Sequence, residues 1–355
     1  MTSRLRAALL GVALLLSGCA EIKYTMRLDP VQQSDATARV WPGGTDKPRF
    51  RYAGQLTGED NFVSDAADAR NSGMKFLHWL VGLVDSGDDR LELARPQSGM
   101  VDAQGRIYVT DTARHAILVF DPVAGKLQVW ERALENADFV TPIGIAQGGR
   151  GEILVVDAEL GGVFRLDRDG NPLGLFGLGA LERPTGIVRD ARGQRIYVAD
   201  THAHDIKVFD DDGRLVQTLG RRGDGDGEMN YPTHLAFADG KLYVADSMNA
   251  RVLILDAQGK QLGTVGRRGR YVGNLSRPKG ISVDDHGNIY VVESFYDNLL
   301  VFNNKGEFLM PIGGTGKEIG QFYLPAGVWN DQQGRVYVAD MFNGRVMIFQ
   351  LLEGK

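Results

Sequence analysis

One segment occurs six times in the chain and constrains the fold more than any other feature. Each copy has an apolar, β-branched run that ends in an acid, then a short turn and a second apolar run. The copies read IYVTDTARHAILVFD, ILVVDAELGGVFRLD, IYVADTHAHDIKVFD, LYVADSMNARVLILD, IYVVESFYDNLLVFN and VYVADMFNGRVMIFQ. The acids are Asp111, Asp157, Asp200, Asp246, Glu293 and Asp340, which are 46, 43, 46, 47 and 47 residues apart. Repetition at a nearly constant period predicts one supersecondary unit built six times.

The rest of each repeat supplies two more strands. A segment led by proline, such as RPTGIVRDARGQR, places an apolar run before the acid-ended one, and a segment such as RLVQTLG follows the second run. Short runs joined by glycine, asparagine and aspartate turns are typical of antiparallel meanders. Four strands in a repeat of this length predict one blade of a propeller. We therefore expect an all-β fold, a β-propeller with six four-stranded antiparallel blades.

The repeat also resembles a known family. The succession Pro-x-Gly-Ile, YVAD and xxNxRV is similar to the NHL repeat, whose family consists of six-bladed β-propellers. The most similar copies are VADSMNARVLIL at 244–255 and VADMFNGRVMIF at 338–349. The resemblance extends over residues 95–355 and implies the same fold that the strand count predicts.

The six acids have a structural interpretation. A carboxylate at the end of a strand can accept hydrogen bonds from backbone N–H groups of the turn that follows. Six repeated acids are therefore better explained as turn stabilisers than as catalytic bases. His204 lies four residues after Asp200, where the family often carries histidine. The resemblance implies that His204 is a structural turn residue, and we interpret His202 as an exposed turn residue.

The N-terminal part of the propeller is expected to close the ring. The last repeat supplies three strands, GVWND, VYVAD and RVMIFQLL, and then the sequence ends. Upstream of the first repeat, RFRYAGQLTG at 49–58 matches the fourth-strand segments in length and composition. An open ring would leave two unpaired sheet edges, which proteins avoid. We therefore predict that Arg49–Leu56 completes blade six and that the propeller comprises residues 49–355.

The first residues have the features of an export signal. Two arginines precede the apolar run AALLGVALLL, which is too short to span a bilayer stably. The next residues, LSGCA, resemble a bacterial lipobox, and their Cys19 is the single cysteine of the chain. The resemblance implies a signal peptide at 1–18, lipidation of Cys19, and sorting by Ala20 to the periplasmic face of the outer membrane. Residues 19–48 would then form a tether. Ordinary secretory cleavage and a buried cysteine are the alternatives.

A short helix is predicted between the closing strand and the first repeat. The segment SGMKFLHWLVGLVDSG at 72–87 has Phe76, Leu77, Leu80 and Leu83 at helical spacing, with serine and glycine at both ends. A helix of about 11 residues is too short to cross a membrane. We expect it to pack on the propeller, and docking to a membrane surface or a partner is the alternative.

Catalytic chemistry has little support in the sequence. No motif of a catalytic triad, a phosphate loop or a dinucleotide fold occurs in the expected context. His202 and His204 share one turn, and His234 replaces glycine in YPTHLAF. Some NHL-type propellers, the peptide amidating lyases, hold zinc with histidines from several blades, whereas only one proline-led segment here has a histidine. Because zinc needs three or four ligands, we expect no cofactor; the alternative is a zinc- or calcium-dependent lyase or lactonase that uses the central channel.

Basic side chains concentrate in two connections between blades. GRRGDGDGEMNYP and GRRGRYVGNLSRPKG contain six arginines, the sixth being Arg277, and Lys279. Five of the arginines form a basic rim with two tyrosines beside them: Arg221, Arg222, Arg267, Arg268, Arg270, Tyr231 and Tyr271. Clustered arginines can hold carboxylate or phosphate groups through paired hydrogen bonds. Solvated loop charge, offset by neighbouring acids, is the alternative.

Taken as a whole, the sequence predicts a monomeric, exported and lipid-anchored propeller. We expect a non-catalytic scaffold or sensor at the cell envelope, whose partner is an envelope protein or a small anionic ligand held on one rim. The lipid would supply the contact with the membrane. A net charge of −5 gives no general attraction to nucleic acid, so no such partner is expected.

Overall fold

The computed structural model describes residues 24–28, 39–64 and 90–352. The predicted signal peptide with Cys19, part of the predicted tether and the predicted helix at 72–87 lie outside the described residues. Within the described ranges, no helix has the length and apolar character that crossing a membrane requires.

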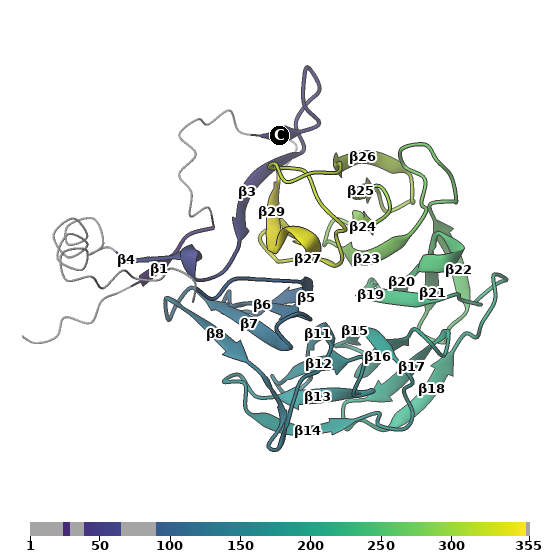
Figure 1. Cartoon of the computed structure of the whole chain (residues 1–355). Coiled ribbons are helices and arrows are strands. Elements are labelled where there is room, and N and C mark those ends of the chain that lie inside the picture. The colour runs from purple at the N-terminus through teal and green to yellow at the C-terminus, as the bar shows by residue number, and fades with distance from the viewer. Residues whose placement is uncertain (1–23, 29–38, 65–89, 353–355) are drawn as a thin grey trace, which may run out of the picture.

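Six antiparallel sheets surround one axis and form the predicted propeller (Figure 1). In blades one to five the four strands pair in chain order, and the first strand of each blade lies nearest the axis. The strand count per repeat and the number of repeats are therefore as the sequence predicts.

The first five blades have these strands. Blade one contains β5 (Pro96–Val101), β6 (Ile107–Asp111), β7 (Ala116–Asp121) and β8 (Lys126–Trp130). Blade two contains β11 (Pro142–Gln147), β12 (Ile153–Asp157), β13 (Gly162–Leu166) and β14 (Pro172–Phe176). Blade three contains β15 (Pro184–Asp190), β16 (Arg195–Asp200), β17 (Asp205–Asp210) and β18 (Leu215–Leu219). Blade four contains β19 (Pro232–Ala238), β20 (Lys241–Asp246), β21 (Arg251–Asp256) and β22 (Gln261–Val265). Blade five contains β23 (Pro278–Val283), β24 (Ile289–Glu293), β25 (Asn298–Phe302) and β26 (Phe308–Gly313).

Blade six combines the two ends of the propeller. Its C-terminal strands are β27 (Val328–Asn330), β28 (Arg335–Asp340) and β29 (Arg345–Leu351). The next strand is β3 (Phe50–Leu56), which pairs antiparallel with β29 from Val346 opposite Leu56 to Leu351 opposite Phe50. The sheet has a fifth strand that the sequence does not predict, β2 (Val40–Trp41), at the outer edge of β3.

Parts of the predicted tether belong to the folded structure. Besides β2, β1 (Tyr24–Met26) pairs antiparallel with β4 (Phe62–Ser64). The remaining small elements are the strands β9 (Arg132–Leu134) and β10 (Ala137–Asp138) and the 3₁₀ turns η1 (Glu59–Asn61), η2 (Ser247–Asn249) and η3 (Met341–Asn343). Two segments of the predicted tether at 19–48, Tyr24–Met26 and Val40–Trp41, therefore form strands.

The core lies between neighbouring blades. The second strands β6, β12 and β24 are buried along their whole length, which suits their β-branched composition. One cluster joins Val292 and Leu299 of blade five to Val338 and Phe349 of blade six. Each fully buried side chain of this kind contributes about 1.5–3 kcal/mol. A single blade would expose these surfaces to water, so the sheets stabilise one another as a ring.

Candidate functional site

The six repeated acids all lie on one face of the propeller. In blades one to five the first strand begins opposite the acid, as Pro96 does opposite Asp111 and Pro184 opposite Asp200, and in blade six Val328 pairs with Val338, two residues before Asp340. This register places the turns after the second strands next to the connections between blades. We call this side the acid face, because the acids end the second strands here.

Each acid anchors backbone, and Asp111 shows the full pattern. Its carboxylate accepts hydrogen bonds from the N–H groups of Ala113 (3.0 Å) and Arg114 (3.2 Å) in the following turn. It also accepts hydrogen bonds from Ala94 (2.7 Å) and Arg95 (3.0 Å) in the connection that leads into the blade. Turn bonds of the predicted kind recur at Asp157 and Glu293. The bonds to the connection are additional, and all six acids make them. A buried carboxylate with four backbone donors is a structural anchor.

The xxNxRV motif holds a connection between blades. In blade four, Asn249 Nδ2 (2.7 Å) and Arg251 Nε (2.9 Å) donate to the carboxylate of Asp246. The same two side chains donate to backbone carbonyls in the connection 223–228, at 2.8–3.2 Å. The equivalent residues of blade six are Asp340, Asn343 and Arg345. The motif therefore shapes the loops that carry the exposed side chains of the acid face.

The position four residues after each acid has a left-handed backbone. The φ angle lies between 54° and 67° at His115, Gly161, His204, Ala250, Asp297 and Gly344. His204 is 6% exposed, and its Nδ1 accepts a hydrogen bond from the N–H of Tyr231 at 3.1 Å. Burial, followed by the charges of Arg222 and His202, lowers the pKa of His204 and keeps the ring neutral, so that it can accept this bond. These contacts are those of a structural turn residue.

The three histidines considered as metal ligands, His202, His204 and His234, do not come together at one site. The rings of His202 and His204 lie 6.1 and 4.5 Å from the ring of Tyr231, whereas His234 lines a cavity on the propeller axis. In the part of the chain that the structure describes, no three histidine, cysteine or carboxylate side chains are close enough together to hold a metal ion.

The basic rim is split between paired and unpaired arginines. Arg221 binds Glu228 with its Nη2 2.8 Å from Oε1, and this hydrogen bond lowers the pKa of the Glu228 carboxyl. Arg268 donates to the carbonyl of Met248 at 2.5 Å. The side chains of three further arginines are exposed and make no hydrogen bond or ion pair with another described residue: Arg222, Arg267 and Arg270. The rim is a charged surface, and none of its side chains lines a described cavity.

Large apolar side chains are exposed beside the basic rim. They lie in turns and connections of the acid face in blades four to six, and we call them the apolar patch: Tyr231, Met248, Tyr271, Val272, Phe295, Tyr296, Tyr323, Leu324 and Phe342. Tyr271 is 84% exposed, and the guanidinium of Arg95 lies 5.4 Å from the centre of the Phe342 ring. Sequence reasoning identified only the two tyrosines next to the basic rim. The other residues occupy turn positions, where a single aromatic residue interrupts no strand pattern.

A cavity of about 220 Å³ lies on the axis of the propeller. The first strands of all six blades line it, among them β5 with Ser98, β19 with His234 and β27 with Trp329. His234 is 6% exposed, and neither ring nitrogen forms a hydrogen bond of normal geometry with a described residue, although the backbone of Lys279 lies near the ring. The indole Nε1 of Trp329 is unpartnered in the same way. Burial lowers the pKa of His234 to about 3, so the ring is neutral at physiological pH.

A lysine lies where the first strands begin, on the acid-face side of this cavity. Lys279, on β23 of blade five, directs its Nζ toward Oε1 of Gln97, on β5 of blade one, at 3.4 Å. Blade six separates these two blades, so the two side chains meet over the axis. The Lys279 ammonium has no carboxylate within ion-pair distance among the described residues. Burial lowers its pKa to about 8, which leaves it mostly charged at pH 7.

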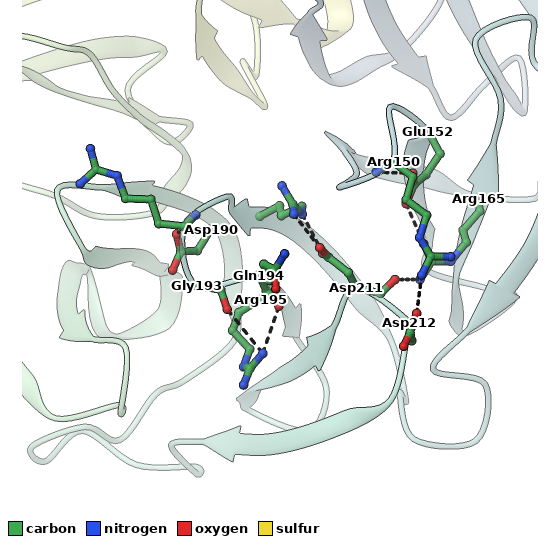
Figure 2. A network of polar contacts seen from close by, with 11 residues as sticks. Arg150, Glu152, Arg165, Asp190, Gly193, Gln194, Arg195, Asp211 and Asp212 are labelled. Carbon is green, nitrogen blue, oxygen red and sulfur yellow. Dashed lines mark hydrogen bonds and ion pairs between the residues drawn. The ribbon is translucent and has the colours of Figure 1, made fainter.

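A network of charged side chains on the opposite face joins blades two and three (Figure 2). Arg165 donates to Glu152 at 2.7 Å and to the carbonyl of Asp211 at 2.8 Å. Arg150 pairs with Asp212 at the edge of the network. Two hollows of about 440 and 410 Å³ border these residues. Because the charges pair with each other across two blades, we assign the network to the packing of the ring.

Two family models match parts of the sequence. One describes an NHL repeat and matches residues 181–209, and the other describes a 6-bladed beta-propeller and matches residues 272–355. This chain is a six-bladed β-propeller that contains an NHL repeat, and we call it the NHL propeller. No curated protein matches the NHL propeller at the level of sequence.

Solved structures share the fold of the NHL propeller. A virginiamycin B lyase from Staphylococcus aureus is 15% identical, with a TM-score of 0.54 over 73% of this chain and 96% of that chain. A gluconolactonase from Xanthomonas campestris is 18% identical, with a TM-score of 0.56 over 75% and 91%. An auxiliary nutrient binding protein from Bacteroides ovatus is 14% identical, with a TM-score of 0.58 over 75% and 71%. At such identities the likeness shows the fold alone, and the three names include both enzymes and a binding protein.

Proposed function

We propose that this NHL propeller is a non-catalytic binding module of the cell envelope, which takes up a partner protein on its acid face. The observation that carries the proposal is the apolar patch over blades four to six. Large apolar side chains that are exposed in neighbouring turns and connections of one face are typical of interaction surfaces. Tyrosine, phenylalanine and arginine are also the residues that interface cores favour, and unpaired arginines of the basic rim lie in the same connections.

The sequence supports a place for this module at the envelope. The lipobox-like LSGCA segment would leave Cys19 as the lipidated first residue of the exported protein, at the periplasmic face of the outer membrane. Multiple acyl chains give stable attachment to a membrane. The propeller would then present its acid face to other envelope proteins while the lipid holds it at the surface.

A pull-down from membranes of the source cells tests the proposal. In the test variant, Tyr271, Phe295 and Phe342 of the apolar patch are each changed to serine. The matched control changes Leu173, Leu215 and Leu262, which are exposed on the outer strands, to serine. With the test variant, we expect the recovered amount of a specific co-purifying protein to fall at least tenfold. With the control variant, this amount should equal that of the wild type. Identical co-purifying proteins for all three chains would contradict a partner site on the acid face.

A lyase or lactonase that acts in the central cavity is the second candidate. The observation that favours it is His234, which replaces a glycine and lines the cavity with both nitrogens unpartnered. Metal analysis of the purified protein distinguishes this candidate from the first. Stoichiometric zinc or calcium that disappears in the His234→Ala variant would favour the enzyme. Absence of metal, or a metal content that the variant does not change, would exclude His234 as a ligand of a catalytic metal.

A further inference from the structure

The axis of the propeller carries a positive charge without a counter-ion. Lys279 reaches the axis, where its only described side-chain partner is the neutral Gln97. Gln97 is itself held in place, because its Nε2 donates to Thr112 Oγ1 at 3.3 Å and lies 2.9 Å from Met341 Sδ. A partly buried charge is costly unless it is paired. The arrangement therefore favours an anion at the ammonium group.

The cavity beside this lysine has hydrogen-bonding groups to spare. Gln97 directly precedes Ser98, and Lys279 lies two residues before Ile281; Ser98 and Ile281 both line the cavity. His234, in its neutral form, offers one donor and one acceptor nitrogen, and Trp329 offers an indole N–H. Buried polar atoms are nearly always satisfied in proteins. Hydroxyl oxygens of a ligand, which both donate and accept, would satisfy these groups.

We propose that the acid-face end of the axial cavity binds a small hydroxy-carboxylate, whose carboxylate pairs with Lys279 and whose hydroxyl groups bond to His234 and Trp329. The cavity of about 220 Å³ has room for roughly seven water-sized groups, which suits an acid of three to six carbons. One ammonium group without an arginine fork matches one negative charge better than a phosphate dianion. This site is separate from the apolar patch, so the proposal does not depend on a partner protein.

Calorimetric titration of the purified protein at pH 7 tests the proposal with five probes. Lactate and propionate differ by one hydroxyl group, glycerate adds a second, acetate supplies the carboxylate alone, and inorganic phosphate supplies a different anion. We expect lactate and glycerate to bind at least fivefold more tightly than propionate and acetate. Absence of binding for all carboxylates, or phosphate binding as tight as lactate, would overturn the assignment.

Two variants locate the binding on the axis. Lys279→Met should weaken lactate binding at least tenfold, and His234→Phe should reduce lactate affinity to that of propionate. The control is Lys241→Met, which removes an exposed lysine at the start of β20. Circular dichroism and melting temperature show whether each variant is folded. Lactate binding that is unchanged in a folded Lys279→Met protein would overturn the proposal.

Proton uptake gives an independent readout. Because the pKa of Lys279 is lowered to about 8 without a counter-ion, a bound carboxylate should raise it again. At pH 8, lactate binding to the wild type should therefore take up part of a proton, seen as a heat that depends on the ionisation enthalpy of the buffer. Binding without proton uptake at this pH would contradict pairing with Lys279.

Discussion

At the residue scale, the glycine of each Pro-x-Gly segment marks how closely the first strands approach one another. A Cβ atom at Gly144 or Gly186 would lie 2.4 or 2.5 Å from a carbonyl oxygen of the next blade. Real side chains do not tolerate such distances, so these positions need glycine. His234 occupies the equivalent position in blade four, and its side chain lines the axial cavity instead. Blade one also departs from glycine here, with Ser98, so His234 is the one titratable side chain that the described residues place at this register position.

The burial of His234 predicts a pH dependence of stability. Its pKa in the folded protein is lowered to about 3, whereas a histidine in the unfolded chain titrates near 6.5. Between these values the unfolded chain binds a proton that the folded protein does not, so the free energy of unfolding falls as the pH falls. Between pH 7 and 4.5, His234 should account for a loss of about 2.5 kcal/mol.

Urea unfolding of wild type and His234→Gln at pH 7 and 4.5 measures this loss. The variant should lose less stability than the wild type over the interval, because glutamine does not titrate. His286→Gln, which removes an exposed histidine, is the control and should keep the wild-type dependence. Equal losses in all three proteins would show that His234 does not remain neutral in the fold.

At the element scale, β3 decides whether the ring is closed. Phe50 and Leu56, at its two ends, are 1% and 0% exposed, and they belong to core clusters on either side of blade six. The strand also covers the edge of β29, which would otherwise present unpaired backbone groups. A segment nearly 300 residues from its partner in sequence therefore completes both a sheet and two cores.

Removal of β3 should destabilise the whole propeller. A chain that begins at residue 59 lacks β3, and we expect it to aggregate or to melt at least 10 °C lower, because ΔG changes of several kcal/mol shift Tm by this order. Leu56→Ala, a milder change, should cost about 2–5 kcal/mol. A chain that begins at residue 24 keeps every described strand and is the control for both. A melting temperature for the 59–355 chain within two degrees of this control would rule out ring closure by β3.

At the scale of the whole molecule, the two faces differ in chemistry. The acid face combines anchored turns with exposed aromatic and arginine side chains, whereas the charged groups of Figure 2 on the opposite face pair with one another. Repeated acids and Asn–Arg pairs hold the loops of the acid face, so the exposed side chains stand on a rigid base. Rigid presentation lowers the entropy cost of binding a partner.

The proposed lipid anchor makes a prediction about the whole protein. Cys19→Ser should move the exported protein from the membrane fraction to the soluble fraction, because the propeller would lose its acyl chains. Fractionation and metabolic labelling with a fatty acid measure the change. The control is the wild-type protein, expressed in the same cells, and this protein should carry the fatty-acid label. A Cys19→Ser protein that stays with the membrane would show that another segment attaches it.

Local sequence patterns are sufficient to predict the blades, but they do not predict which residues form the candidate sites. The acid, the turn and the flanking strands of a blade lie within about 15 residues, so their pairing follows from spacing and alternation. Asp111 shows the limit, because its bonds to Ala94 and Arg95 come from the preceding connection. The basic rim was identified from neighbouring arginines, yet Arg221 is engaged by Glu228. Most of the apolar patch cannot be recognised in the sequence, because each of six separate turns and connections contributes only one or two of its residues.

The sequence by itself determined the number of blades, the strand order and the closing strand, because each depends on hydrophobic periodicity, turn residues and the need to pair an edge. Only the tertiary structure decided which polar groups meet on the axis. Lys279 and Gln97 are 182 positions apart, and no local pattern relates them to His234 or Trp329. Their contact arises because six first strands converge on one line, and convergence is a property of the closed ring.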